Sequence, residues 1–399
     1  MLHLLPTNSL HVGMYVTDIA VEWHKHPTLF SQEGLISSPE ALESIQEAGF
    51  TEAYVDLKKS QQGVLPPGVV ELLEPLAHSP FQNAPFTPKV ALHTESSIAR
   101  KIYNETLELS HKIANEARNG MIDVASAKPC IEDIYTSLDR NHDALLGITK
   151  LRQADEYTYT HSINVSIFSI LLSKALGASR EAVLEIGLGA LFHDFGKYYI
   201  PPEIINAPRK LTPEEFAVMK QHPSLGAKAL TKLASPTSTL VKIAKEHHEK
   251  FDGTGYPHGL AGDAISTVGA LASIADIFDA LTSKRAYKDP FPMSQALSII
   301  YSLRGEAFAP TYVDQFVRAL GVFPFGTVVK LTDGRIGIVS QTATTHALRP
   351  KVTIIFDHKG RRVITHEIDL AQEPELKIES SVAPHTLGIN PAVKLNLHT

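Results

Sequence analysis

The spacing of apolar residues changes twice along this chain of 399 residues. Between about residues 96 and 320, apolar side chains recur every three or four positions, a spacing typical of amphipathic helices. On either side, short alternating runs are separated by turn residues, which is typical of β-strands. The pattern predicts a mainly α protein, in which a small α+β N-terminal domain (residues 1–75) precedes the helices and a small β appendage (residues 321–399) follows them.

Local signals define the elements of the N-terminal domain. Residues 12–20 alternate loosely between apolar and polar positions and predict a strand, and residues 53–57 predict a second one. Ser38 suits the N-cap position and Pro39 suits the first turn, so a helix is expected over residues 39–48.

Prolines are concentrated after this domain, and we assign residues 76–95 to a Pro-rich linker. Residues 96–144 carry apolar positions at helical spacing, which predicts connecting helices over residues 96–120 and 131–141. Such helices could transmit a signal or form a homodimer, and plain packing accounts for the pattern equally well.

Residues 145–320 form the predicted helical domain. Thr212, Pro213 and Glu215 have the form of a capping box, so a helix is expected to begin there and to end near His222. The other helices predicted from apolar spacing cover residues 154–176, 181–191, 240–250, 268–283, 294–303 and 311–320.

The C-terminal appendage begins with a hairpin signal. Asp333-Gly334 separates two β-rich runs, residues 327–331 and 335–340. Further strands are predicted over residues 351–356 and 362–366, and residues 375–399 are expected to form a tail.

Composition narrows the partners and the location. The net charge of −6 provides no basic surface for a long nucleic acid. Cys130 is the single cysteine, so no disulfide can form within the chain, which fits a reducing compartment. The N-terminus lacks the segments of a signal peptide, and the most apolar helical run, residues 163–176, is too short and too polar to cross a bilayer. We therefore expect a cytoplasmic protein without membrane insertion.

Candidate metal ligands are concentrated between residues 161 and 276. They are His161, His193, Asp194, His222, His247, His248 and Asp276. Imidazole nitrogens and carboxylate oxygens suit divalent Fe, Mn, Ni, Co or Zn, and the lack of thiols argues against a closed structural zinc site. Each histidine alone would more often be structural, but their combination in an all-helical domain indicates a metal site.

The adjacent pair His193-Asp194 indicates how two ions could be held. An imidazole can bind one ion while the neighbouring carboxylate bridges two, and a bridging water becomes hydroxide near neutral pH. We expect one ion on His161, His193, Asp194 and Asp276, and the other on Asp194, His222, His247 and His248. Such a centre suits phosphoryl displacement, and Lys197, one helical turn after His193, could bind the phosphate or support the leaving oxygen.

The sequence around these residues resembles the HD-GYP family of cyclic-dinucleotide phosphodiesterases, a branch of the HD hydrolases. The resemblance covers about residues 145–320 and includes both the His193-Asp194 pair and the Gly255-Tyr256-Pro257 signature. The matching stretches are YTYTHSINV (157–165), HDFGK (193–197), QHP (221–223), HHEKFDGTGYPHGL (247–260) and IADIFDALTSKRAYK (274–288). Residues 1–75 also look like the small N-terminal domain of unknown function that often precedes this catalytic domain.

The resemblance implies an HD-type helical bundle that hydrolyses cyclic di-GMP to linear pGpG, and often onward to GMP. It places the metal on the seven ligands named above and gives catalytic roles to Asp194 and Lys197. The substrate-binding residues that it implies are Lys197, Tyr256, Arg285 and Lys288. Tyr256 either orients the substrate or simply packs. Protein partners would bind through the N-terminal domain or the signature loop.

One position departs from part of the family. Members with a third metal carry glutamate one turn before the first histidine, where this chain has Tyr157. We therefore predict two divalent ions, with Fe or Mn favoured, and inefficient cleavage of the linear product. Two alternatives stay open: a phosphodiesterase that prefers hybrid cyclic GMP-AMP, and a receptor that binds a cyclic dinucleotide without hydrolysing it.

Overall fold

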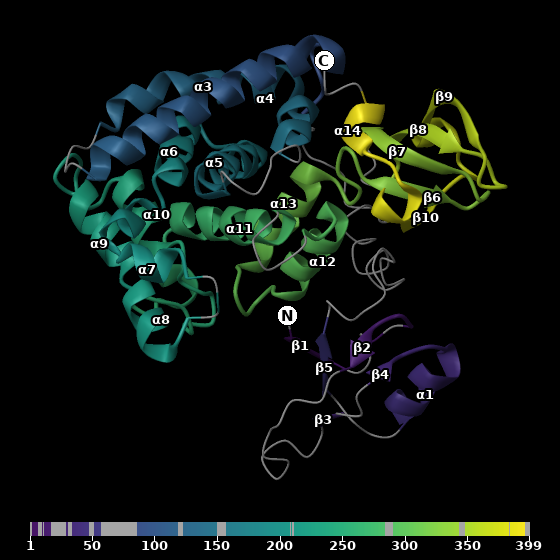
Figure 1. Ribbon diagram of the computed structural model, residues 1–399, viewed down its shortest axis with the longest axis horizontal. Helices are drawn as coiled ribbons and strands as arrows, with labels where there is room; N and C mark the ends of the chain where they lie inside the picture. Colours follow the sequence, from purple (N-terminus) through teal and green to yellow (C-terminus); the bar gives the residue numbers. More distant parts are fainter. Residues whose placement is uncertain are drawn as a thin grey trace.

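The structure is a computed structural model that contains a body of helices and two small sheets (Figure 1). Along the chain, one sheet precedes the helices and the other follows them. It describes residues 2–6, 10, 12–16, 29–30, 34–47, 52–56, 86–118, 123–149, 157–207, 209, 211–283, 290–342, 348–382 and 384–395. This arrangement confirms the prediction of a mainly α chain with β structure at each end. No helix in these ranges is long and apolar enough to cross a membrane.

The N-terminal sheet has the strand order β1-β5-β2-β4, and β3 pairs in parallel with β5. Its strands are β1 (Leu2–Pro6), β2 (Tyr15–Val16), β3 (Leu29–Phe30), β4 (Gly34–Leu35) and β5 (Glu52–Asp56). The predicted helix is confirmed as α1 (Pro39–Glu47), where the amide of Ala41 donates to Ser38 Oγ at 3.3 Å. The strand predicted over residues 12–20 is limited to β2 among the described residues, and residues 17–20 lie outside them.

The helical body is built around α5. Its helices are α3 (Leu92–Arg118), α4 (Lys128–Thr149), α5 (Tyr157–Ala175), α6 (Arg180–Leu191), α7 (Pro202–Ile205), α8 (Pro213–Met219), α9 (His222–Leu230), α10 (Thr239–Glu246), α11 (Thr267–Thr282), α12 (Met293–Ser302) and α13 (Pro310–Leu320), with 3₁₀ turns η3 (Ala125–Ala127), η5 (Phe195–Tyr199) and η6 (Gly262–Ala264). Helices α3, α4, α6, α11 and α13 all pack against α5. Because α5 is covered on several sides, its apolar residues extend around most of its surface and are buried.

The chain between residues 212 and 230 corrects one prediction. The capping box at Thr212 is present and begins α8, as expected. The helix does not continue to His222, however, because α8 ends at Met219 and His222 begins a separate helix, α9, with Pro223 in its first turn. Proline lacks an amide hydrogen, and only the first turn of a helix leaves that amide without an intrahelical partner. Pro223 therefore marks a helix start.

Two glycines allow the turn η5 to approach α9 closely. A Cβ atom on Gly196 would lie 1.8 Å from the carbonyl oxygen of His222 and 2.6 Å from the amide nitrogen of Gly226. Any side chain at position 196 would therefore separate the two backbones. This contact brings the residues that precede η5 next to the start of α9.

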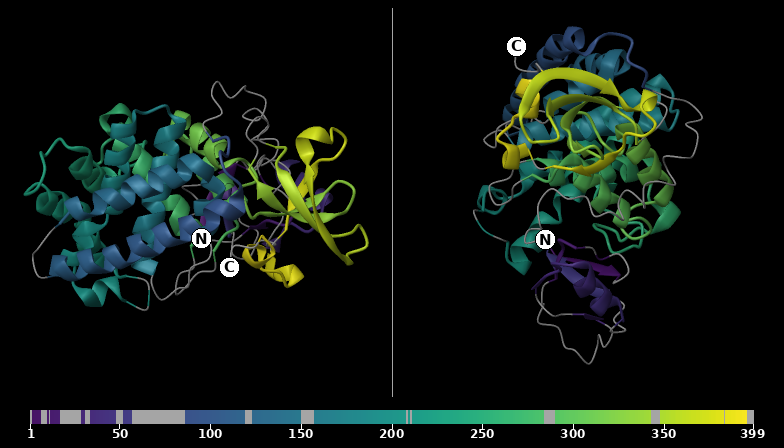
Figure 2. Two further views of the ribbon diagram at one scale, coloured as in Figure 1. Left: turned by 90° about the horizontal axis from the view of Figure 1, so that it is seen from above. Right: turned by 90° about the vertical axis from the view of Figure 1, so that its right-hand side faces the viewer.

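The C-terminal sheet has the order β10-β6-β7-β8-β9, with antiparallel neighbours, and lies at one end of the helical body (Figures 1 and 2). Its strands are β6 (Val328–Leu331), β7 (Ile336–Gln341), β8 (Lys351–Phe356), β9 (Arg362–Asp369) and β10 (Ile378–Ser381), accompanied by η7 (Leu370–Gln372), η8 (Pro384–Leu387) and α14 (Pro391–Lys394). The predicted hairpin at Asp333-Gly334 is confirmed. The prediction of a tail over residues 375–399 is wrong where β10 forms, because this strand pairs with β6 as part of the sheet.

Buried hydrogen bonds attach this sheet to the helices. Helix α4 is interrupted at Asn141, whose backbone is extended (φ −161°, ψ 99°). Just beyond this kink, the buried Asp143 carboxylate accepts hydrogen bonds from the amide (3.0 Å) and the hydroxyl (2.6 Å) of Thr342, which follows β7. Apolar residues of the sheet also join the main core of the body.

Candidate metal centre

Five places in the helical body supply the predicted metal ligands. His161 lies in the first turns of α5, the pair His193-Asp194 follows α6, and His222 is the first residue of α9. The ligands from the last two places are His247 and His248, which follow α10, and Asp276 in α11. These side chains are buried, except that of His248, which is 20 % exposed.

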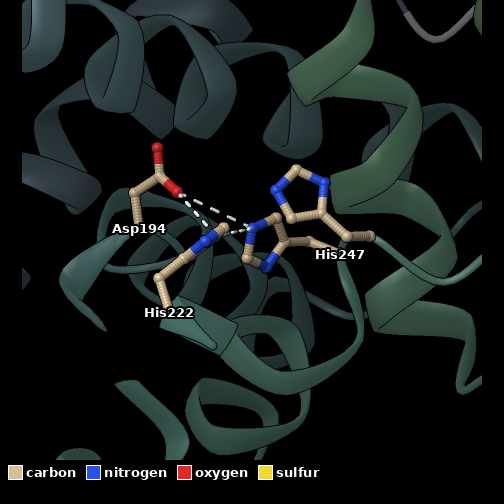
Figure 3. A group of neighbouring side chains, drawn as sticks. Asp194, His222 and His247 are labelled. Carbon is tan, nitrogen blue, oxygen red and sulfur yellow. Dashed lines mark hydrogen bonds and ion pairs between the residues drawn. The ribbon is translucent and has the colours of Figure 1, made fainter. Parts of the chain in front are cut away.

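The first group of ligands consists of Asp194, His222, His247 and His248. One potential ligand atom from each of the four lies within 4.8 Å of the others. Asp194 Oδ1 is 3.3 Å from His222 Nε2 and 3.7 Å from His247 Nε2, and the two imidazole nitrogens are 3.2 Å apart (Figure 3).

The second group consists of His161, His193 and Asp276, whose ligand atoms also lie within 4.8 Å of one another. His161 Nε2 is 3.1 Å from Asp276 Oδ1. The other carboxylate oxygen of Asp194, Oδ2, is 3.3 Å from His193 Nε2 and 3.7 Å from His161 Nε2. Each oxygen of Asp194 therefore faces a different group.

The backbone determines which imidazole nitrogen faces the centre. The Nδ1 atoms of His193, His222 and His247 lie 2.8, 2.8 and 3.1 Å from the carbonyl oxygens of Ala190, Met219 and Ala244, respectively. A carbonyl oxygen can only accept, so each Nδ1 carries the hydrogen and donates it. In its neutral form, each ring then directs the lone pair of Nε2 into the centre, and this form of histidine binds a metal.

This donor arrangement fits a bound cation. In the neutral rings, the Nε2 lone pairs of His222 and His247 face each other at 3.2 Å. Among the described residues, His193 Nε2 and Asp194 Oδ1 are buried polar atoms without a hydrogen-bond partner of good geometry. Buried lone pairs left this way cost stability unless a proton or a metal ion binds them. Nitrogen and carboxylate oxygen donors suit divalent transition metals.

Three of the candidate ligand histidines have shifted pKa values. Burial lowers the pKa of His222 and of His248, so both rings are neutral at neutral pH. Burial also acts to lower the pKa of His161, but its hydrogen bonds to Asp276 and Asp279 outweigh burial and raise that pKa to about 9. The His161 ring therefore carries a proton at neutral pH when no metal is bound.

Sequence reasoning assigned no role to Asp279, which the structure places beside His161. Asp279 Oδ2 lies 2.6 Å from His161 Nδ1, and Asp279 Oδ1 accepts from Asn164 Nδ2 at 2.7 Å. A second acidic residue three positions after Asp276 was a usable signal, because residues at this spacing share one face of a helix.

Lys197 and Tyr256 both lie at the centre. Lys197 Nζ is 2.5 Å from Asp194 Oδ2, and the Lys197 side chain is 31 % exposed. The Tyr256 ring packs on the His248 ring with 4.7 Å between centroids, and the Tyr256 amide donates to the His248 carbonyl at 3.1 Å. Burial raises the pKa of the Tyr256 phenol. Arg285 and Lys288 lie outside the described residues.

The signature loop is held against α10 by a buried carboxylate. Glu249 accepts hydrogen bonds from the amides of His258 (2.8 Å) and Leu260 (2.9 Å). A Cβ atom on Gly255 would lie 2.3 Å from the amide nitrogen of Lys250, so only glycine fits there. The loop therefore returns to the chain that carries His248.

Three family matches cover most of the chain. Residues 149–311 match the HD domain, residues 2–127 match a domain of unknown function, DUF3391, and residues 328–390 match a KOW domain associated with the HD domain. The last match covers the strands of the β appendage.

Known proteins with similar sequences match either most of this chain or the part that contains the HD domain. A cyclic di-GMP phosphodiesterase of Pseudomonas aeruginosa is 32 % identical over 374 residues, which is 92 % of this chain and 88 % of that protein. A cyclic di-GMP phosphodiesterase of Thermotoga maritima is 41 % identical over 41 % of this chain and 45 % of its own length. A 3′3′-cGAMP-specific phosphodiesterase of Vibrio cholerae is 36 % identical over 42 % of this chain and 36 % of its own length.

The first similarity includes both the N-terminal region and the HD domain, so it is not limited to a shared catalytic motif. The sequence motifs of the HD domain, the His/Asp cluster and this similarity agree with one another. The chain belongs to the HD-GYP family of cyclic-dinucleotide phosphodiesterases.

Proposed function

We propose that this enzyme hydrolyses cyclic di-GMP to linear pGpG at a centre that binds two divalent metal ions. The observation that carries this proposal is the position of Asp194, whose two carboxylate oxygens face two separate groups of ligands. A carboxylate placed this way can bridge two ions, as two-metal phosphoesterases require. The names of the Pseudomonas and Thermotoga relatives support cyclic di-GMP as the substrate.

Each ion would have its own set of ligands. His161, His193 and Asp276 would bind one ion, His222, His247 and His248 would bind the other, and Asp194 would contribute to both. When bound, such ions supply Lewis-acid activation of the phosphodiester and of water. Fe and Mn are the ions that we favour.

The chain itself binds and orients the substrate. Lys197 places a partly exposed ammonium next to Asp194, where it would attract a phosphate oxygen and stabilise the charge that develops on it. Arg285 and Lys288 would supply further positive charge to phosphate or guanine. Tyr256 packs on His248, so we assign it first to orienting that ligand and second to contacting the substrate.

The hybrid cyclic GMP-AMP is a second candidate substrate, because the Vibrio relative is named for it. Both substrates present the same phosphodiester to the centre, and they differ in one base. Chromatography of the products from each, under equal conditions with Mn²⁺- or Fe²⁺-loaded protein, tests the proposal. Faster release of linear product from cyclic di-GMP supports it. Preference for the hybrid would change the substrate, and tight binding without product would instead indicate a receptor.

The number of ions is a separate part of the proposal. Helix α5 begins at Tyr157, one turn before His161, where family members with a third metal have glutamate. A phenol is a poor ligand for such an ion, so we propose two ions and slow conversion of pGpG to GMP. Metal analysis of anaerobically purified protein tests this proposal, and three ions per chain would refute it.

A further inference from the structure

A chain of buried hydrogen bonds connects α3 to the metal ligand His161. The hydroxyl of Tyr103, on α3, donates to Asn164 Oδ1 at 2.9 Å. Asn164 Nδ2, on α5, donates to Asp279 Oδ1 at 2.7 Å, and Asp279 Oδ2 lies 2.6 Å from His161 Nδ1. All four side chains are buried.

Hydrogen-bonding chemistry fixes the direction of each step in this relay. Carboxylate oxygens accept hydrogen bonds, so His161 Nδ1 and Asn164 Nδ2 are the donors to Asp279. With its amide nitrogen facing Asp279, Asn164 directs its oxygen towards Tyr103, whose hydroxyl must then donate. The ring of His161 is left with Nε2 facing the centre, 3.1 Å from Asp276 Oδ1.

Helix α3 reaches the centre at a second point. Ser110 lies two helical turns after Tyr103, on the same side of α3. Together with Ile113 it lines a cleft that also includes Asp194 and Lys197. All of α3 lies within the segment that matches DUF3391, and none of it lies within the segment that matches the HD domain. A helix from outside the catalytic family segment thus supports the centre.

We propose that Tyr103, Asn164 and Asp279 are positioning residues that hold His161 in its ligand orientation. Through them, α3 sets the affinity of the group formed by His161, His193 and Asp276 for its ion. Partners that orient a metal-binding histidine contribute strongly to metal affinity, although they do not touch the metal. This inference rests on the proposed two-ion centre.

Titration of the metal-free full-length protein with Mn²⁺ tests the relay. Tyr103→Phe removes only the hydroxyl. The Mn²⁺ affinity of one of the two sites should fall on the order of fivefold, because one buried hydrogen bond is lost. Asp279→Asn acts directly on His161 and should lower the Mn²⁺ affinity of the same site about 10- to 100-fold. The other ion should bind as in the parent protein. Tyr135→Phe on α4, where the ring contacts Lys174, is the matched control and should leave both affinities unchanged.

The double variant Tyr103→Phe/Asp279→Asn distinguishes a relay from two independent contributions. Because Tyr103 acts through Asp279, the double variant should bind Mn²⁺ no more weakly than Asp279→Asn alone. Additive losses, unchanged affinities in Tyr103→Phe, or an equal loss at both ions would overturn the relay. A parent protein that binds no ion would overturn the two-ion centre, whereas a parent that binds two ions and a Tyr103→Phe variant that matches it would overturn the relay alone.

Discussion

Asp194 is the residue on which both groups of ligands converge, because each of its oxygens faces different imidazoles. Asp194→Asn replaces one of these oxygens by an NH2 group, which donates hydrogen bonds and does not bind a cation. Metal content should fall from about two ions per chain to one or none, and turnover of cyclic di-GMP should be lost with it. Elemental analysis and product chromatography on the same sample measure both.

Asp139→Asn provides a control of the same chemistry elsewhere in the body. Asp139 is a partly exposed carboxylate that pairs with Lys89 and Lys174 and lies in α4. Its substitution should leave metal content and turnover unchanged. Retention of both ions in Asp194→Asn would contradict a bridging carboxylate.

The raised pKa of His161 predicts that metal binding depends on pH. In the metal-free protein this pKa is about 9, above the value of about 6.5 for an unfolded histidine. Protonated His161 therefore stabilises the metal-free fold fully below about pH 6.5, and this stabilisation is lost as the pH rises through about 9. A metal needs the neutral ring and must displace the proton. Mn²⁺ affinity at one site should therefore rise about tenfold per unit between pH 7 and pH 9. Calorimetry at pH 7 in two buffers that differ in ionisation enthalpy should show proton release on Mn²⁺ binding. Equal Mn²⁺ affinities at pH 7 and pH 9 would contradict the assignment.

Residue types alone identified the seven candidate ligands, because histidine and aspartate at these spacings have few common structural uses in combination. The role of Asp279 could not be found in that way. Its partner His161 lies 118 positions away in the sequence, and only the packing of α11 against α5 brings the two side chains together.

At the scale of elements, the contact between η5 and α9 should be essential for the centre. Gly196→Ala would place a methyl group 1.8 Å from the carbonyl oxygen of His222, a backbone atom that cannot rotate away. We expect a loss of roughly 1–3 kcal/mol in the free energy of unfolding together with much weaker Mn²⁺ binding. Thermal unfolding and metal titration measure the two effects.

Gly187→Ala is the matched control for this substitution. Its methyl group would meet the side chains of Ile170 and Ile131, which can shift, and α6 itself contains none of the candidate ligands. This variant should lose stability but retain its Mn²⁺ affinity. Equal retention in Gly196→Ala would show that the η5–α9 contact does not position the ligands.

Elements defined by local signals were predictable, and those defined by distant partners were not. The capping box of α8 and the hairpin between β6 and β7 depend on neighbouring residues. The start of α9 was missed because Pro223 follows a helix and begins another, and a proline is compatible with either role. Strand β10 was missed because it is short and pairs with β6, far away in the sequence.

Across the whole molecule, the bond between Asp143 and Thr342 is a specific polar attachment of the C-terminal sheet to the helical body. Thr342→Val removes the hydroxyl and leaves one oxygen of a buried carboxylate without this donor. The free energy of unfolding should fall by roughly 1–3 kcal/mol, with turnover unchanged because the metal ligands are on other elements.

Thr149→Val serves as the control, because the Thr149 hydroxyl donates to the carbonyl of Leu146 at 2.9 Å, within its own helix. Its free energy of unfolding should lie within about 0.5 kcal/mol of that of the parent protein. Loss of metal from Thr342→Val would contradict a purely mechanical attachment.

The number of ions required for turnover tests the central claim most directly. Metal-free protein is titrated with Mn²⁺, and the initial rate of pGpG release from cyclic di-GMP is measured at each ratio of metal to protein. A two-ion centre predicts that the rate remains low up to one equivalent, if the sites fill in sequence, and rises until two equivalents are bound. A rate that reaches its maximum at one bound equivalent would contradict the proposed centre.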